Sequence, residues 1–321
     1  MKLGVMMALF GQRKLEEALD YVARSGVEMV ELCAGNYPGE PHFKVEELLK
    51  DDKKVASLEK VLKDRDLKIS ALSCHGNPLH PDEKIATAHC TAQRNAILLA
   101  EKLGIERVIG FSGCPGDCDT AKYPNWVTCP WPDDYSKILE WQWKEKVIPF
   151  WKKEAEFANK HNIKMICFEM HPGFVVYNTE TLLKLRSAVG DIIGANFDPS
   201  HLFWQGIDPI LSLRKLGSAV FHVHAKDTMI YEMNSKVNGV LDTKSYGDKL
   251  NRSWIFRTVG YGHGYDFWKD FVSTLRMIGY DYVLSIEHED SLMSMNEGFQ
   301  KAVSFLKEVL LSEDKTAMWW A

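Results

Sequence analysis

The sequence predicts an α/β protein of the (β/α)8 TIM barrel class. Eight short apolar runs alternate with segments of helical periodicity. Such alternation is typical of a parallel sheet with right-handed crossovers. Eight strand–helix units within 321 residues favour one closed barrel over an open doubly wound sheet, because a single barrel of this size is routine. No G-x-G-x-x-G pattern follows the first run, which weakens a dinucleotide-binding alternative.

Each predicted strand is a short apolar run followed by turn residues. The eight strands cover residues 3–9, 27–34, 67–74, 107–111, 163–168, 192–198, 219–224 and 281–286. The helices follow them over residues 15–25, 45–65 (as one or two helices), 82–103, 135–161, 179–189, 207–216, 266–278 and 297–311. Gly26, Gly104 and Gly217 stand where three of these helices should stop. Pro149 should interrupt the helix over 135–161.

Residues 1–321 are predicted to form one barrel domain. Two connections, 112–134 and 228–264, are unusually long. Connections of this length inside a compact domain are usually lids or binding loops. We therefore expect both to lie over the C-terminal mouth of the barrel.

Charge and composition exclude several classes of partner. The net charge of −5 gives no electrostatic reason to bind nucleic acid or an anionic membrane. No apolar run approaches the roughly 20 residues that span a bilayer. The N-terminus enters a strand without the pattern of a signal peptide, so a cytoplasmic location is expected.

The chain has seven cysteines, an odd and scattered set that indicates reduced thiols rather than a disulfide framework. Cys114, Cys118 and Cys129 share one loop, and a structural zinc there is an alternative to ordinary loop thiols. Their spacing lacks the usual C-x-x-C pair.

The sixth strand ends at Asp198, because Pro199 cannot continue the ladder, and His201 follows three residues later. An acid before a proline is also ordinary turn chemistry. A carboxylate or a histidine also stands at the ends of other predicted strands, however, and in a barrel these ends share one mouth. The residues at these predicted ends are His75, Glu169, Asp198 with His201, His224 and Glu287.

Four of these residues make a candidate metal site. Glu169, Asp198, His224 and Glu287 close four consecutive strands and supply three carboxylates and one imidazole. Any one of them is compatible with a solvated strand end, but polar groups inside a barrel must be paired or metal-bound. The set is rich in oxygen and free of thiolate, which suits Mn²⁺ or Mg²⁺, with Zn²⁺, Co²⁺ or Fe²⁺ as alternatives.

Four runs of the chain resemble the xylose isomerase-like barrel superfamily, and within it the sugar phosphate isomerase/epimerase branch, which includes tagatose 3-epimerase-like enzymes and inosose dehydratases. The runs are Phe168-Glu169-Met170-His171-Pro172, Phe197-Asp198-Pro199-Ser200-His201, His222-Val223-His224-Ala225-Lys226-Asp227 and Ser285-Ile286-Glu287-His288-Glu289-Asp290.

The resemblance covers essentially the whole chain and implies roles for its residues. It implies that Glu169, Asp198, His224 and Glu287 bind one divalent ion and that His201 contacts a small carbohydrate substrate. Glu169 and Glu287 would be the acid/base pair. The ketose 3-epimerases have an arginine shortly after the metal histidine, whereas this chain has Lys226 and Asp227 there, which weakens an assignment to free ketoses.

These roles agree with the chemistry of proton transfer next to a carbonyl. The reaction needs a base near the carbon and stabilisation of an enediolate, for which a metal ion acts as Lewis acid and template. His201, His75, Lys226 and Arg257 are candidates to hold substrate hydroxyls or the oxyanion.

Three of these candidates also have a simpler interpretation. Lys226 and Asp227 could pair with each other, Arg257 could lie on the surface, and His75 could be an ordinary loop histidine. Three further histidines have other expected roles. His222 should be a hydrogen-bonded core residue, and His171 and His288 could orient carboxylates.

Five tryptophans gather after the fourth strand, where they could stack on a sugar, pack helices or contact another copy of the chain in a homo-oligomer. They are Trp126, Trp131, Trp141, Trp143 and Trp151. Three other functions compete with a metal-dependent isomerase or epimerase. They are an inosose dehydratase-like lyase, a non-catalytic sugar-binding barrel and, least favoured by the acidic charge, an endonuclease IV-like nuclease.

Overall fold

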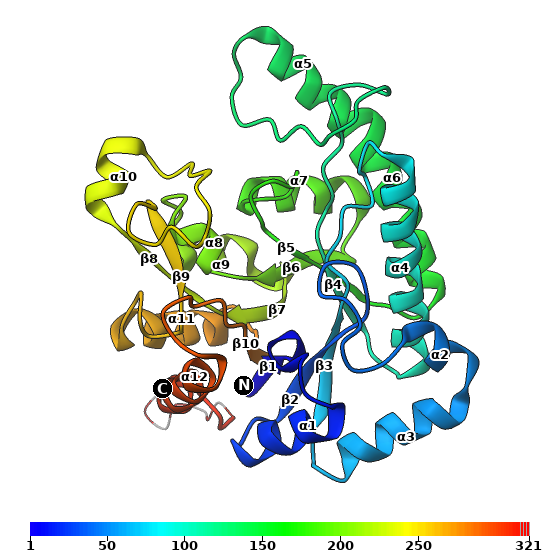
Figure 1. Ribbon diagram of the computed structural model, residues 1–321, viewed down its shortest axis with the longest axis vertical. Coiled ribbons are helices and arrows are strands. Elements are labelled where there is room, and N and C mark those ends of the chain that lie inside the picture. The colour runs from blue at the N-terminus through cyan, green and yellow to red at the C-terminus, as the bar shows by residue number, and fades with distance from the viewer. Residues whose placement is uncertain (315, 317, 319, 321) are drawn as a thin grey trace.

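Eight parallel strands form a closed barrel in the computed structural model, which describes residues 1–314, 316, 318 and 320 (Figure 1). The barrel strands are β1 (Lys2–Met6), β2 (Met29–Cys33), β3 (Lys68–Ser73), β4 (Arg107–Gly110), β5 (Met165–Glu169), β6 (Ile193–Phe197), β7 (Val220–Ala225) and β10 (Val283–Ile286). Around the barrel they follow the order β1-β10-β7-β6-β5-β4-β3-β2. The predicted (β/α)8 TIM barrel is confirmed.

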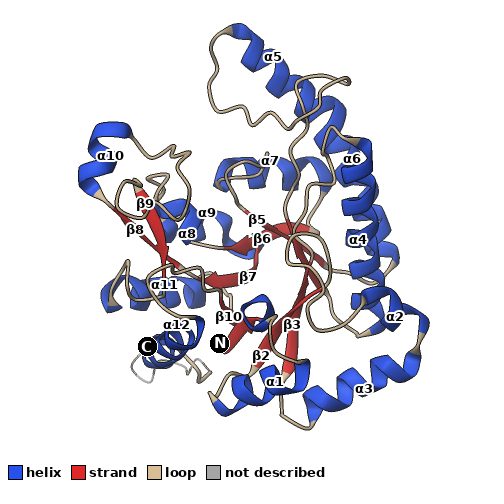
Figure 2. Cartoon of the chain, in the orientation of Figure 1, coloured by secondary structure: helices blue, strands red, loops and turns tan. Residues whose placement is uncertain are grey.

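Helices surround the strands on the outside, as the blue and red elements of Figure 2 show. They are α1 (Leu15–Arg24), α2 (Val45–Lys50), α3 (Asp52–Lys63), α4 (Glu83–Lys102), α5 (Asp133–Trp141), α6 (Ile148–Lys160), α7 (Thr179–Val189), α8 (Ser200–Phe203), α9 (Pro209–Leu216), α10 (Glu232–Asn238), α11 (Tyr265–Met277) and α12 (Met295–Val309). Gly104 follows α4 at a φ of 67°, the left-handed conformation that favours glycine at a helix end.

The barrel strands are buried on both faces, which explains why they read as apolar runs. Every residue of β2 and β6 is buried. On the outer face, Phe197 of β6 packs against Phe271 of α11 with their ring centroids 5.8 Å apart. A small separate apolar cluster consists of Ala71, Ile109 and Cys167.

Two predicted elements differ in their bounds. The first strand was expected over 3–9, but it ends at Met6, and a 3-10 turn over Met7–Phe10 buries Met7 and Phe10. The helix expected over 135–161 consists of α5, a π-helical segment over Gln142–Val147, and α6. The three segments follow one another without a break, so Pro149, the second residue of α6, does not interrupt the helix as expected.

The connection 228–264 is not irregular throughout. It contains α10, β9 (Trp254–Arg257) and most of β8 (Asp227–Ile230), and β8 pairs antiparallel with β9. Trp254 stacks on Trp204, with ring centroids 4.7 Å apart and planes 5° from parallel. This small sheet lies beside the barrel, with α10 projecting beyond it (Figure 1).

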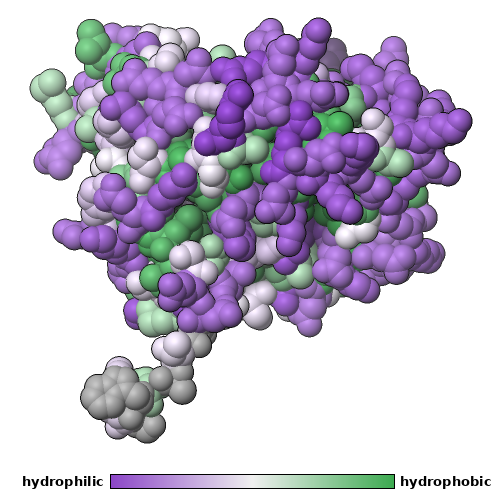
Figure 3. Space-filling view, turned by 90° about the horizontal axis from the view of Figure 1, so that it is seen from below, coloured by the Kyte–Doolittle hydropathy of each residue, from purple (hydrophilic) through white to green (hydrophobic). Residues whose placement is uncertain are grey.

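Hydrophilic side chains dominate the face seen in Figure 3, and apolar residues show only in smaller areas between them on the described part of that face. None of the described helices is long and apolar enough to cross a membrane. The seven cysteines are all free, in agreement with the reduced thiols expected from their scattered positions. Cys114 is buried while Cys118 and Cys129 are exposed, and no group of metal-type ligands found among the described residues includes them.

Candidate metal centre

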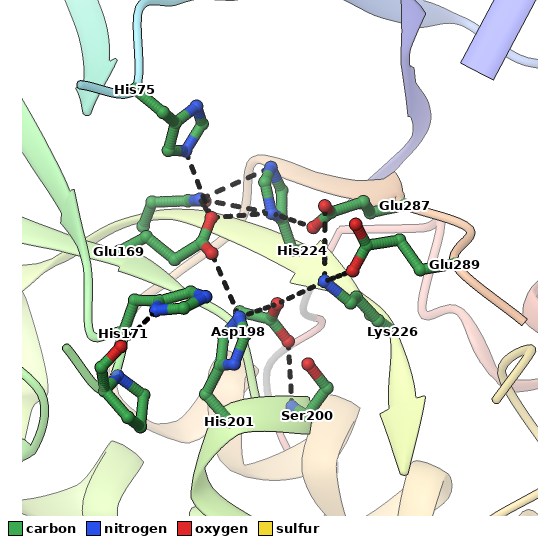
Figure 4. A network of polar contacts seen from close by, with 12 residues as sticks. His75, Glu169, His171, Asp198, Ser200, His201, His224, Lys226, Glu287 and Glu289 are labelled. Atoms are coloured by element: carbon green, nitrogen blue, oxygen red, sulfur yellow. Dashed lines mark hydrogen bonds and ion pairs between the residues drawn. The ribbon is translucent and has the colours of Figure 1, made fainter. Parts of the chain in front are cut away.

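Four side chains meet at the C-terminal mouth, each from a different strand (Figure 4). Glu169 is the last residue of β5, and His224 lies one residue before the end of β7. Asp198 and Glu287 directly follow β6 and β10. Because these four strands are neighbours in the barrel, their ends converge. One ligand-type atom of each side chain lies within 4.8 Å of those of the other three.

His224 stands between the two glutamates. Its Nδ1 lies 2.8 Å from Glu287 Oε2 and 3.3 Å from Glu169 Oε2. The imidazole itself is fully buried. The ring therefore presents one nitrogen to a pair of carboxylates that come from opposite sides of its own strand.

Asp198 has one satisfied and one unsatisfied oxygen. Its Oδ1 accepts a hydrogen bond of 2.8 Å from the backbone N–H of Ser200, which begins α8. Its Oδ2 is buried and accepts no hydrogen bond from the described residues, although His201 Nε2 lies at 3.3 Å and Lys226 Nζ at 3.6 Å. An unsatisfied buried carboxylate oxygen is costly unless a cation neutralises it.

Lys226 is the buried cation of this cluster and does not pair with Asp227. Its Nζ lies 2.7 Å from Glu289 Oε2 and 3.2 Å from Glu287 Oε1, and 4.3 Å from the centroid of the Phe256 ring. The carboxylate of Asp227 instead accepts backbone N–H groups of the 260–263 loop. Asp227 therefore holds that loop in place, and the Lys226–Asp227 alternative is wrong.

The carboxylates control the charge of the site. Burial disfavours the ammonium, but the nearby carboxylates, Glu287 first, raise the pKa of Lys226 well above its usual value. Burial likewise disfavours the imidazolium, yet Glu31 and Glu287 raise the pKa of His224. Burial raises the pKa of Asp198 in spite of Lys226. Asp198 is thus the metal-site carboxylate whose ionised form its neighbours stabilise least.

The other predicted site residues are placed as follows. His75 Nε2 lies 3.1 Å from Glu169 Oε2, and His201 Nε2 lies 3.1 Å from Glu169 Oε1. Both histidines therefore contact the candidate centre. Arg257 is buried rather than on the surface, but its Nε donates to Asp290 Oδ2 at 3.0 Å. It lines neither cavity of the mouth.

Three further histidines lie farther from the centre or below it. His222 is a hydrogen-bonded core residue, as expected, with Nδ1 2.8 Å from Asn196 Oδ1. His171 packs its ring against His201 with centroids 4.1 Å apart, and its Nδ1 donates to the carbonyl of Pro172. His288 contacts Thr258 instead of a ligand carboxylate, so it does not orient one.

Two carboxylates escaped the sequence analysis. Glu31 of β2 is fully buried, and its Oε2 lies 2.9 Å from His224 Nε2. The available signal was an acid in the interior of an apolar strand, on the same face as Met29 and Cys33. Glu289 pairs with Lys226 and lies in the loop after β10, two residues beyond Glu287.

Two cavities open beside the cluster and share Glu289. One, of about 430 Å³, is lined by Glu169, Glu287 and His75 together with aromatic and apolar side chains. The other, of about 470 Å³, is lined by His171, Tyr246, Ile255, Phe256, Glu289 and Ser291. A cavity of about 620 Å³ lies outside the barrel against α1, α2 and α3 and has no part in this cluster.

No tryptophan of the 126–151 group lines either mouth cavity. Trp143 and Trp151 are buried, and Trp151 Nε1 donates to the carbonyl of Ser112 at 2.8 Å. Trp126 packs against Tyr177. Helix and loop packing is therefore the role of these three residues, and the aromatic walls come from other segments.

The donor set fits a divalent cation. Three carboxylates and one imidazole nitrogen, without thiolate, are the ligands of a hard or borderline ion. The unsatisfied Asp198 Oδ2 points to the same conclusion. Two other groups of possible metal ligands share residues with this one. The first consists of Glu31, His222 and His224, and the second of Glu169, His171 and His201.

Replacing Lys226 by methionine should destabilise the metal-free protein. The change leaves the buried Asp198 and the partly buried Glu287 without their ammonium, and loss of one partner of a buried ion pair typically costs about 3–5 kcal/mol. Adding Mn²⁺ should raise the melting temperature of this variant more than that of the wild type, since the ion replaces the missing charge. Urea unfolding and thermal melts with and without Mn²⁺ measure both effects.

Lys236→Met is the matched control, because Lys236 pairs with Glu232 on the exposed surface of α10. It should change stability little, with or without Mn²⁺. Equal losses in the two lysine variants would contradict the role given to Lys226.

A model of the xylose isomerase-like TIM barrel family matches residues 19–309. The uncharacterized protein YfiH of Bacillus subtilis (strain 168) is 39% identical over 312 residues, which cover 97% of this chain and 99% of that protein. Both matches extend over the strands that carry the four clustered side chains.

Solved structures share the fold at low identity. The IOLI protein, crystallised with a bound zinc atom, has a TM-score of 0.65 at 20% identity, covering 97% of this chain and 98% of that one. A D-tagatose 3-epimerase-like protein has a TM-score of 0.64 at 20% identity, with 96% and 98% covered.

Proposed function

Because the chain belongs to the xylose isomerase-like TIM barrel family, we propose that it is a divalent-metal-dependent sugar isomerase or epimerase. The observation that carries the proposal is the placement of Glu169 and Glu287. They come from β5 and β10, flank His224, and line the same cavity of about 430 Å³. Two carboxylates facing one sugar-sized space are suited to moving a proton next to a carbonyl.

Both glutamates are held in the form that can accept a proton. Burial alone would raise the pKa of Glu169, but hydrogen bonds from His201, His224 and His75 hold it well below its usual value. Lys226 and His224 likewise lower the pKa of Glu287 to about 2 against the effect of burial. Each carboxylate is therefore ionised at neutral pH.

One glutamate removes the proton from the carbon beside the carbonyl. In an epimerisation the other returns a proton to the opposite face, whereas in an aldose–ketose isomerisation the proton returns to the neighbouring carbon. His75 lines the same cavity as the two glutamates, where it holds a substrate hydroxyl and stabilises the negative charge that develops on the carbonyl oxygen. His201 and Lys226 line neither cavity, and they contact Glu169 and Glu287 and hold these carboxylates in place. Arg257 donates a hydrogen bond to Asp290 and has no part in this chemistry.

Glu169, Asp198, His224 and Glu287 would hold the metal ion. When bound, such an ion supplies Lewis acidity and a template for substrate oxygens. Three carboxylates favour Mn²⁺ or Mg²⁺. The zinc in the IOLI structure and the epimerase-like neighbour support a metal-dependent sugar enzyme, although at 20% identity they share only the fold.

The test is a screen in D₂O with Mn²⁺ present. Ketoses, aldoses, their phosphates and inososes are incubated with the protein, and recovered material is analysed by NMR and mass spectrometry. Deuterium at a carbon next to the carbonyl, together with an isomer or epimer, is the expected result. Loss of water without deuterium in the recovered substrate would replace this proposal with the dehydratase alternative.

A further inference from the structure

Glu31 lies beneath the candidate metal centre and has no part in the chemistry proposed above. It is fully buried on β2 and lines neither cavity of the mouth. A substrate in those cavities therefore does not reach it. A carboxylate in such a place needs another explanation, because burying a charge is costly unless it is paired and hydrogen-bonded.

The main partner of Glu31 is His224. Glu31 Oε2 accepts the Nε2–H of the His224 ring at 2.9 Å. His222 is too far to take this place, with its Nε2 at 3.8 Å, and its ring already contacts Asn196 and Ser70. The two nitrogens of His224 are thereby divided, with Nε2 facing Glu31 and Nδ1 facing Glu169 and Glu287.

Glu31 is itself fixed by two other strands. The hydroxyl of Ser73, the last residue of β3, donates to Glu31 Oε1. The hydroxyl of Ser285 on β10 donates to Oε2 at 2.8 Å. With its own position on β2, the carboxylate is held from three strands. It therefore offers His224 a rigid acceptor, whereas a solvated carboxylate would not.

We propose that Glu31 is a positioning residue that fixes the orientation and tautomer of His224, so that Nδ1 faces Glu169 and Glu287 as a metal ligand. This role rests on the proposed metal site. Carboxylates that accept the second N–H of a metal-binding histidine hold the ring in place and increase its basicity. Here the acceptor comes from β2, which is not adjacent to β7 in the barrel.

The test compares Glu31→Gln with Glu154→Gln in the full-length protein. Glu154 is also a buried glutamate in an ion pair, with Arg94, but it lies on α6 outside the barrel. Metal-free protein is titrated with Mn²⁺, and the visible absorption bands of bound Co²⁺ report the ligand geometry. Glu31→Gln should weaken Mn²⁺ binding about 10- to 100-fold and shift the Co²⁺ bands. Glu154→Gln should do neither.

A double variant, Ser73→Ala with Ser285→Ala, keeps the test valid if Glu31→Gln fails to fold. It releases the Glu31 carboxylate while leaving its contact with His224, and it should also weaken Mn²⁺ binding and broaden the Co²⁺ bands. Wild-type affinity and spectrum in the folded variants would overturn only the role of Glu31. A wild-type protein that binds no Mn²⁺ would overturn the metal site and this role together.

Discussion

Glu169→Gln and Glu287→Gln are each expected to reduce turnover by about 100- to 10,000-fold, the usual contribution of a positioned acid or base. Glutamine keeps the size and one oxygen of the side chain but cannot accept the substrate proton. Both residues line the cavity of about 430 Å³ beside His224. Steady-state kinetics on the substrate found in the D₂O screen measures the loss.

The metal content of each variant must be measured with its kinetics, since both residues are also proposed ligands. The loss of turnover should persist at saturating Mn²⁺, because added metal does not restore the missing base. Glu232→Gln on the exposed surface of α10 is the control and should retain wild-type activity. If both Glu169→Gln and Glu287→Gln turned over at the wild-type rate, the acid/base mechanism would be wrong.

Asp198→Ala combined with His224→Ala is expected to abolish metal binding. The two changes remove the unsatisfied Asp198 Oδ2 and the Nδ1 that faces the glutamates. The affinity for Mn²⁺ should fall by more than about 100-fold, which is the largest loss expected when only a residue that hydrogen-bonds a metal ligand is removed. After dialysis against Mn²⁺, elemental analysis should find one manganese ion per chain in the wild type and none in the double variant.

His161→Ala serves as the control for general effects of removing a histidine. His161 is partly buried and pairs with Glu101 at the end of α6, away from the mouth. This variant should keep one ion per chain. Unchanged metal content in the Asp198 and His224 double variant would exclude the proposed ligands.

The barrel and the four clustered residues could be predicted because one signal repeats. Each strand is a buried apolar run, and Glu169, Asp198, His224 and Glu287 interrupt or follow such runs at the same end. Parallel strands of a barrel bring those ends together whatever the details of packing. Local sequence and topology therefore suffice to bring the four side chains together.

Glu31 could not be found in this way. It lies in the middle of β2 and shows no signal at a strand end. Its partner His224 is 193 positions away, so only the closed barrel brings them together. For Lys226 the sequence offers the adjacent Asp227 as one possible partner, whereas the folded chain places its ammonium on Glu287 and Glu289, about 60 positions away.

The buried position of Arg257 could not be predicted from the sequence for a different reason. It lies on β9, which pairs with β8 across the long connection that contains α10. Two four-residue strands joined by so long a connection lack the turn residues that mark a tight hairpin. The buried pair of Arg257 with Asp290 follows from this small sheet and could not be anticipated from a loop.

The most direct test of the metal site is anomalous diffraction from crystals of the protein grown with Mn²⁺. The structure predicts one strong anomalous peak among Glu169, Asp198, His224 and Glu287, with His224 Nδ1 as the imidazole ligand. A map without a peak at this position, from crystals that contain saturating Mn²⁺, would contradict the candidate metal centre and the proposed function that depends on it.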